Sequence, residues 1–319
     1  MLTAYNEKQE RVLARNAHKD ASYYCPVCHE QLILKQGNKN IAHFAHGRQC
    51  AHHANGETLL HCKLKLLLFH IMSNYDNDVQ LEPYLSDIQQ IPDIVVGKYA
   101  IEVQLSPLPI QQMHKRTEGL VRAGYRVIWL TTLPRYRHGV YYLNQLQQNC
   151  IDPLHCEMYG IHPINYQLYR LNNMVSLTAR QFHADCEPIA YEQLLSDDIR
   201  NSVGMITVRK LATARIMQYL VQCRRKRSVH DPVLSLVYQM KLTEAQVIQL
   251  TGFIFPEQIH VYTHPVLWQL KVFEALRYQR DPCHVLARCI KLRQFAIGNY
   301  SSLEIITQLV ERYRKIIKL

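Results

Sequence analysis

Two acidic residues in neighbouring apolar segments are the side chains of this sequence best suited to chemistry. Asp93 follows Pro92 in the segment 91–96, and Glu102 lies nine residues later in the apolar segment 99–105. A buried carboxylate with no local cation is costly unless it holds a metal or a proton. Carboxylate oxygens suit Mg²⁺ and Mn²⁺, and metal-assisted hydrolysis of a phosphodiester needs such ligands. We therefore predict a Mg²⁺ or Mn²⁺ site at Asp93 and Glu102.

The residues around these acids offer supporting chemistry. Gln104 lies two residues after Glu102 and shares its face of the expected strand, where its amide can place a water but cannot act as a cationic base. Glu57, His61 and Lys65 recur at four-residue spacing and share one helix face. His61 could shuttle a proton, Lys65 could neutralise phosphate charge, and Glu57 could bind the metal or orient His61. The alternative is an ordinary exposed Glu–His–Lys ladder.

A second set of candidate ligands lies near the N-terminus. Cys25 and Cys28 have the two-residue spacing that lets both thiolates reach one tetrahedral zinc ion. His43, His46 and Cys50 follow at a suitable distance in the sequence, and the spacing does not fix which of them complete the four ligands. We predict a structural Zn²⁺ site, with a redox pair or unoccupied thiols as the alternatives.

Positive charge suggests a polyanionic partner. The formal net charge is +11, and residues 201–227 contain seven basic residues and no acid. Such a face suits nucleic acid, although a solvated helix surface has the same composition. Arg116 could bind the phosphate backbone, and a surface role is equally compatible with its position. The predicted nucleic-acid contacts at the end of the basic segment are Arg224, Arg225, Lys226 and Arg227.

Elements that position the acids follow from hydrophobic periodicity. Leucines and isoleucines at three- and four-residue spacing predict a helix over residues 57–73. The order of helices and strands after it predicts an α/β core. The expected strands cover residues 79–85, 91–96, 99–105 and 125–131, and the expected helix covers residues 110–123. From about residue 191 onward the pattern is helical almost throughout.

Three regions follow from these patterns: a zinc-finger-like module over residues 1–55, the α/β core over 56–135 and a mainly helical region over 136–319. No apolar run approaches 18 residues, and the first 20 residues hold no secretory signal, so we expect a cytoplasmic protein without a membrane span. The scattered cysteines favour reduced, buried thiols over disulfides.

Together these residues resemble the CoiA competence proteins of Gram-positive bacteria. The matching segments are 24–28, 41–46, Glu57 with His61 and Lys65, 92–95, 100–104 with Ser106, and 125–129. The resemblance implies an N-terminal zinc-finger-like module, a restriction-endonuclease-like PD-(D/E)xK core and a helical C-terminal region. It implies catalytic positions at Asp93, Glu102 and Gln104, supported by His61 and Lys65. Gln in place of the usual Lys belongs to the family pattern, whereas Ile91 stands where an Arg is expected.

The resemblance also ties the chain to the processing of incoming single-stranded DNA and to recombination during natural transformation. The favoured hypothesis is a metal-dependent endonuclease that acts on single-stranded or branched DNA. The alternative is a non-catalytic DNA-binding accessory protein that retains the nuclease fold and contacts recombination proteins such as RecA. A zinc-dependent regulator of a specific duplex sequence is disfavoured, because no recognition-helix pattern precedes the acids.

Overall fold

The computed structural model describes residues 1–37, 40–47, 58–76, 78–196, 208–226, 230–298 and 300–318. The chain forms two compact units, and each has hydrophobic clusters of its own. Because the chain passes between the units several times, no single boundary near residue 135 separates them. The first unit consists of Met1–Leu133, Tyr159–Arg170 and Pro188–Ile199, and the second of Pro134–Met158, Leu171–Glu187 and Arg200–Leu319.

The N-terminal part of the first unit is a small antiparallel sheet with the strand order β2-β1-β3-β4-β5. Leu32 and Phe44 are buried in its core, while Gln31 and Ile33, which flank Leu32 on the same strand, are exposed. This alternation is expected for a sheet with one covered face. The strands and one short 3₁₀ helix are β1 (Thr3–Tyr5), β2 (Arg11–Leu13), η1 (Ala14–Asn16), β3 (Tyr23–Tyr24), β4 (Gln31–Gly37) and β5 (Asn40–His46).

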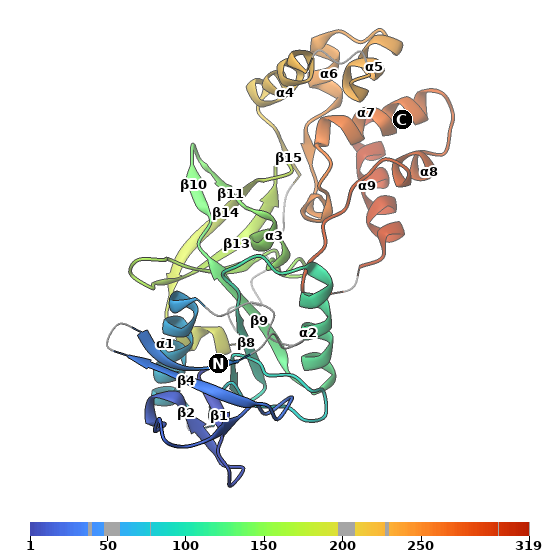
Figure 1. Ribbon diagram of the computed structural model, residues 1–319. Helices are drawn as coiled ribbons and strands as arrows, with labels where there is room; N and C mark the ends of the chain where they lie inside the picture. Colours follow the sequence, from blue (N-terminus) through green and yellow to red (C-terminus); the bar gives the residue numbers. More distant parts are fainter. Residues whose placement is uncertain are drawn as a thin grey trace. The chain divides into compact units, whose positions relative to one another are not determined.

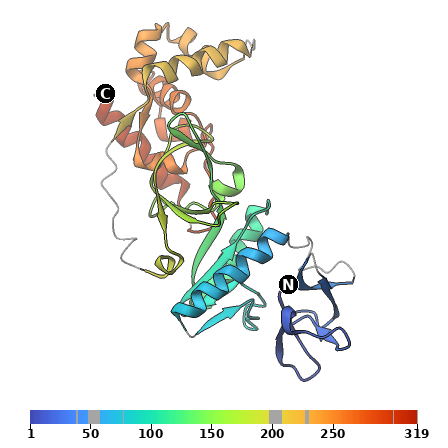
Figure 2. The same cartoon turned by 90° about the vertical axis from the view of Figure 1, so that its left-hand side faces the viewer.

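The second sheet of this unit has the order β12-β9-β8-β7-β6. The β8–β9 and β9–β12 pairs are parallel, and β6–β7 and β7–β8 are antiparallel. Figure 2 shows α1 lying across one face of these strands, and α2 packs against β9 (Figure 1). The mixed α/β architecture expected from the sequence is therefore confirmed. The elements are α1 (Leu59–Tyr75), β6 (Val79–Leu81), β7 (Ile94–Val96), β8 (Tyr99–Val103), α2 (Ile110–Arg122), β9 (Arg126–Thr132) and β12 (Met158–Ile161), followed by η2 (Tyr191–Leu195).

Local chemistry explains where these elements begin and end. Thr58 caps α1, because its side chain accepts a hydrogen bond from the amide of His61 at 3.2 Å. The predicted strand 79–85 ends early at Leu81, because Glu82 adopts a left-handed conformation with φ 50° and Pro83 follows it. This turn directs the Glu82 side chain back into the core.

Side-chain alternation along β8 separates the core from the candidate site. Ile101 and Val103 are buried in the cluster that α1 covers. Glu102, between them, points to the opposite face, as does its register partner Trp129 on β9. Trp129 donates a hydrogen bond to Thr117 of α2 at 3.1 Å, which places Glu102 on the α2 side of the sheet.

The second unit combines strands with helices. Strands β10, β11, β14 and β13 lie next to one another in that order, so the first part of the region 136–319 consists mostly of strands, with the short helix α3 among them. The strand pattern was weak because β14 buries only Phe182 and Ile189 and exposes four consecutive residues. The elements are β10 (Arg135–Arg137), β11 (Val140–Tyr142), α3 (Gln145–Asn149), β13 (Leu168–Ser176) and β14 (Gln181–Ile189).

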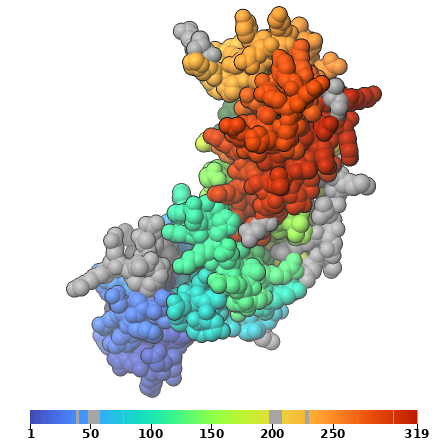
Figure 3. Space-filling view, turned by 90° about the vertical axis from the view of Figure 1, so that its right-hand side faces the viewer, coloured from blue at the N-terminus to red at the C-terminus, as the bar shows by residue number. Residues whose placement is uncertain are grey.

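The rest of the second unit is mainly helical, as the sequence predicts. In the space-filling view these segments, orange to red, form one continuous packed body (Figure 3). No helix in the described part of the chain is long and apolar enough to cross a membrane. The elements are β15 (Arg209–Lys210), α4 (Thr213–Arg225), α5 (Pro232–Gln239), α6 (Glu244–Leu250), β16 (Phe253–Ile254), η4 (Pro256–His260), α7 (Pro265–Arg277), α8 (Pro282–Ala287) and α9 (Ser302–Ile317).

Candidate active site

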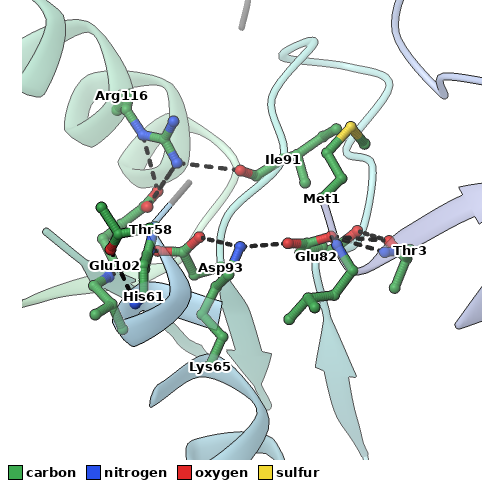
Figure 4. A network of polar contacts seen from close by, with 12 residues as sticks. Met1, Thr3, Thr58, His61, Lys65, Glu82, Ile91, Asp93, Glu102 and Arg116 are labelled. Atoms are coloured by element: carbon green, nitrogen blue, oxygen red, sulfur yellow. Dashed lines mark hydrogen bonds and ion pairs between the residues drawn. The ribbon is translucent and has the colours of Figure 1, made fainter. Parts of the chain in front are cut away.

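Asp93 lies where α1 approaches the beginning of β7. Its Oδ2 accepts a hydrogen bond from the backbone amide of Val103 at 2.8 Å and lies 3.3 Å from Nε2 of His61. Its Oδ1 lies 3.4 Å from Nζ of Lys65. The Asp93 side chain is only 11% exposed, so these contacts replace the water that the carboxylate would otherwise bind. The structure therefore brings together His61, Lys65 and Asp93, although His61 and Asp93 are 32 positions apart in the sequence (Figure 4).

Lys65 is fully buried, although its helix position was read as part of a possible exposed ladder. Its ammonium group forms an ion pair with Glu82 in addition to the contact with Asp93. Glu82 also accepts hydrogen bonds from the backbone amides of Leu2 at 2.6 Å and Thr3 at 3.0 Å. Lys65 therefore lies between two buried carboxylates, and Glu82 ties the N-terminal sheet to the core (Figure 4).

Glu102 has a cationic partner from α2. Nη2 of Arg116 lies 2.6 Å and 2.8 Å from the two carboxylate oxygens, and its Nε lies 3.2 Å from Oε1. Nη2 also donates to the carbonyl of Ile91 at 3.1 Å. Glu102 is 2% exposed, whereas the Arg116 side chain is 37% exposed. The guanidinium thus covers the acid from the solvent side, a role that differs from the predicted phosphate contact.

The two acids have opposite electrostatic environments. Burial alone would raise the pKa of Asp93, but the positive charges of Lys65 and His61 outweigh it and hold that pKa well below its ordinary value. Burial and the negative charge of Asp93 raise the pKa of Glu102 to about 7, against the opposing effect of Arg116. The site therefore combines one firmly ionised carboxylate with one that readily takes a proton.

The donor set fits a hard divalent cation. Asp93 and Glu102 are buried carboxylates near enough for the charge of one to raise the pKa of the other, and a divalent cation between such groups relieves that repulsion. An ion at Glu102 requires Arg116 to release at least one carboxylate oxygen. Gln104 lies just beyond the end of β8, and its Nε2 donates to the carbonyl of Ser106 at 2.7 Å. Glu57 lies outside the described residues.

The cysteine–histidine cluster forms part of the N-terminal sheet. The Sγ atoms of Cys25 and Cys28 and a ring nitrogen of His46 all lie within 4.8 Å of one another. Cys28 Sγ and His46 Nε2 are 3.4 Å apart, and the amide of Val27 lies 3.4 Å from Cys25 Sγ. This geometry resembles a metal knuckle with three ligands.

His43 is not part of that cluster. It is three residues from His46 on β5, so the two side chains point to opposite faces of the sheet. Its Nδ1 lies 2.9 Å from the carbonyl oxygen of Ile41. Cys50, the alternative fourth ligand, lies outside the described residues.

The predicted basic contacts are only partly available for nucleic acid. Arg224 pairs with Glu244 at 2.5 Å, and Lys226 lies 3.7 Å from Asp231. Arg225 is exposed at the end of α4. Arg227 lies outside the described residues.

Sequence reasoning underestimated Glu82. The sequence placed it within the expected strand 79–85 and suggested no charged partner for it, whereas the structure uses it as the partner of Lys65 and of two backbone amides. Pro83 directly after Glu82 was the available signal, since proline at that position marks the end of a strand.

Two family models match the chain. Residues 57–202 match the nuclease-like domain of competence protein CoiA, and residues 5–53 match the CoiA N-terminal domain. The α/β fold and this match together show a protein with a nuclease-like domain.

One curated relative extends over most of the chain. Competence protein CoiA of Bacillus subtilis (strain 168) is 24% identical over 317 aligned positions, covering 92% of this chain and 85% of the relative. No solved structure matches. The chain belongs to the competence protein CoiA family.

Proposed function

We propose that this protein is a metal-dependent DNA endonuclease with a PD-(D/E)xK core that acts on single-stranded or branched DNA in transformation and recombination. The observation that carries the proposal is the pair of buried, mutually repelling carboxylates, Asp93 and Glu102, with cationic side chains around them. A Mg²⁺ or Mn²⁺ ion held by the two acids would polarise the scissile phosphate and activate a water.

The protein's own residues would divide the remaining tasks. Lys65 keeps Asp93 ionised, and the Val103 amide fixes the direction of its carboxylate. His61 lies at the more exposed edge of the site, with 20% of its side chain accessible, and is the residue best placed to exchange a proton with solvent. Arg116 is free to bind a substrate phosphate only after it releases Glu102.

The N-terminal sheet is proposed to hold a structural Zn²⁺ through Cys25, Cys28 and His46 with a fourth ligand. The contacts of Glu82 with Leu2 and Thr3 connect this sheet to the acids. Loss of zinc should therefore loosen the wall of the nuclease site as well as the N-terminal sheet.

The test is cleavage by purified full-length protein with Mn²⁺ on single-stranded, duplex, flap and Holliday-junction DNA. Asp93→Asn and Glu102→Gln should abolish cleavage, while Glu118→Gln, an exposed acid on α2, should retain it. Wild-type protein that leaves all four substrates intact, or an active Asp93→Asn protein, would refute the proposal.

One observation favours the second candidate, a non-catalytic DNA-binding accessory protein that contacts a recombinase such as RecA. All four carboxylate oxygens of Asp93 and Glu102 already face donors, and the Gln104 amide is engaged by Ser106. In that case Glu102→Ala should leave DNA binding and transformation frequency at wild-type levels. Loss of transformation with retained folding would decide in favour of the endonuclease.

A further inference from the structure

The second unit contains a polar pocket remote in sequence from the buried acids. Its cavity of about 420 Å³ is lined by the turn between β13 and β14, by Tyr142 of β11, by one face of α4 and by His264 at the beginning of α7. This volume falls within the range of about 300–1,000 Å³ typical of small-ligand sites. A pocket of this size accommodates one part of a larger ligand or a single small molecule.

The charge of the pocket is positive. Its lining includes Arg180 and Arg215 and no acidic residue. Arg215 donates to the side-chain oxygen of Gln181 at 3.1 Å, and neither arginine pairs with a carboxylate within the described ranges. Two guanidinium groups without acidic partners favour an anionic ligand, and phosphate matches their geometry.

The helix that forms one wall has a sharply divided surface. Ile216, Leu220 and Cys223 are buried on one side of α4. Arg215, Gln218, Tyr219 and Gln222 line the pocket on another side, at helical spacing. Arg225 continues the polar side beyond the pocket, ten residues or roughly 15 Å along the helix axis from Arg215. α4 contains no acidic residue, so the only charges on this face of the helix are those of Arg215 and Arg225.

Aromatic rings complete the lining. The rings of Tyr219 and His264 are stacked, with centroids 3.5 Å apart and an interplanar angle of 7°. Nδ1 of His264 accepts a hydrogen bond from the amide of Val266, and burial lowers the pKa of His264 to about 3, so the ring is neutral. Tyr142 accepts a hydrogen bond from Gln181 at 3.2 Å. Neutral aromatic and amide groups beside phosphate-binding arginines suit a nucleobase.

The turn that forms the opposite wall is fixed before any ligand arrives. Nη2 of Arg293 donates to the carbonyl oxygens of Thr178 at 3.0 Å and Ala179 at 3.2 Å. The amide of Leu177 also donates to Gln181 across the turn at 2.9 Å. A preorganised wall reduces the conformational entropy lost on binding.

From this arrangement we infer that the pocket binds one nucleotide of a single-stranded DNA chain. Arg180 and Arg215 hold the phosphate, and the base enters beside Tyr142 and Tyr219. A base inside a duplex is stacked and paired, so a concave pocket of this size selects an unpaired strand. The choice of DNA as the ligand rests on the proposed function, whereas the binding itself needs no divalent metal and does not depend on cleavage at Asp93 and Glu102.

Fluorescence anisotropy with a labelled twenty-nucleotide thymidine oligomer, without added divalent metal, tests whether Arg180 and Arg215 contribute to binding. The double variant Arg180→Gln/Arg215→Gln should bind the oligomer at least about tenfold more weakly. The slope of log Kd against log salt concentration should become smaller by about 1–2, because about 1–2 phosphate contacts are lost. The matched control Arg288→Gln/Arg314→Gln removes two exposed charges from the same unit and should change Kd less than about twofold. Equal losses in both variants would overturn the pocket as the site.

Photo-crosslinking locates the base without changing the pocket. A 5-iodouracil-substituted strand should crosslink to peptides that contain Tyr142 or Tyr219, and an unlabelled thymidine oligomer should compete. An abasic strand should compete at least about tenfold more weakly, because stacking contributes about 1–3 kcal/mol per base. Crosslinks confined to other peptides, equal competition by duplex DNA or the abasic strand, or binding of RNA but not DNA would each refute the proposal.

Discussion

Replacing Lys65 by methionine tests the electrostatic account of the site directly. Methionine has a similar length but no charge, so Lys65→Met leaves Glu82 and Asp93 buried without their shared cation. Removing one partner of a buried ion pair typically costs about 3–5 kcal/mol. Glu82 keeps its backbone donors Leu2 and Thr3, so we expect the lower end, about 3 kcal/mol in the free energy of unfolding. This corresponds to a fall of roughly 6–12 °C in Tm.

Urea unfolding followed by tryptophan fluorescence measures this effect in the relevant unit. The chain has two tryptophans, Trp129 in the first unit and Trp268 in the second. A Trp268→Phe background therefore makes the signal specific for the first unit. Lys63→Met is the matched control, because Lys63 lies on the same helix and is exposed. It should change the free energy of unfolding by no more than about 0.5 kcal/mol.

The pH dependence of the free energy of unfolding provides a second test of this electrostatic account. The pKa of Asp93 is lowered in the folded state, so its stabilising contribution is present above its unfolded pKa of about 3.9 and is lost as the pH falls further. Without Lys65 that pKa rises, and protonation in acid removes the unpaired charge. The deficit of Lys65→Met should therefore be larger at pH 7 than at pH 4. A deficit equal to that of Lys63→Met, or one that grows in acid, would refute this reasoning.

Three further predictions concern the second acid, the zinc cluster and the C-terminal unit. Burial raises the pKa of Glu102 from 4.5 to about 7, so the free energy of unfolding of the metal-free protein should fall by roughly 3 kcal/mol as the pH rises through that window, at about 1.4 kcal/mol per pKa unit. Glu102→Gln should remove this fall. Parallel stability–pH profiles of the wild type and Glu102→Gln would contradict the prediction. Cys25→Ser should abolish zinc binding measured by elemental analysis, whereas His43→Asn should retain it; zinc loss in both would place His43 among the ligands. Arg293→Met should destabilise the second unit by at least about 3 kcal/mol in urea unfolding, because it removes the guanidinium donor from five carbonyl oxygens, three of them in buried contacts. The exposed Arg288→Met is the control, and equal stability of the two variants would show that other donors satisfy these carbonyls.

Local patterns predicted the elements around the site with good accuracy. The helix expected over residues 57–73 is α1, and the expected strands 91–96 and 99–105 contain β7 and β8. These predictions succeed because periodicity and turn residues act over a few neighbouring positions. The strands between residues 135 and 189 were missed, because their apolar residues do not alternate regularly.

The pairing of charges was not readable from the sequence. Lys65 and Arg116 looked like candidates for phosphate binding, and each instead neutralises a buried acid. Glu82 looked like a strand residue, and its positive φ turns it toward Lys65. Each of these contacts joins residues at least 14 positions apart, a distance over which local pattern carries no information.

The sequence by itself determined which residues could do chemistry and which family the chain resembles, because acid spacing, the two-cysteine knuckle and helix periodicity are local properties. Only the tertiary structure decided how those groups are used. Packing of α1 and α2 brings Lys65 and Arg116 to two different buried acids, and strand alternation places His46, but not His43, beside the cysteines. Burial then sets the pKa values, since the energy of a charge depends on the whole surrounding structure rather than on its neighbours in the chain.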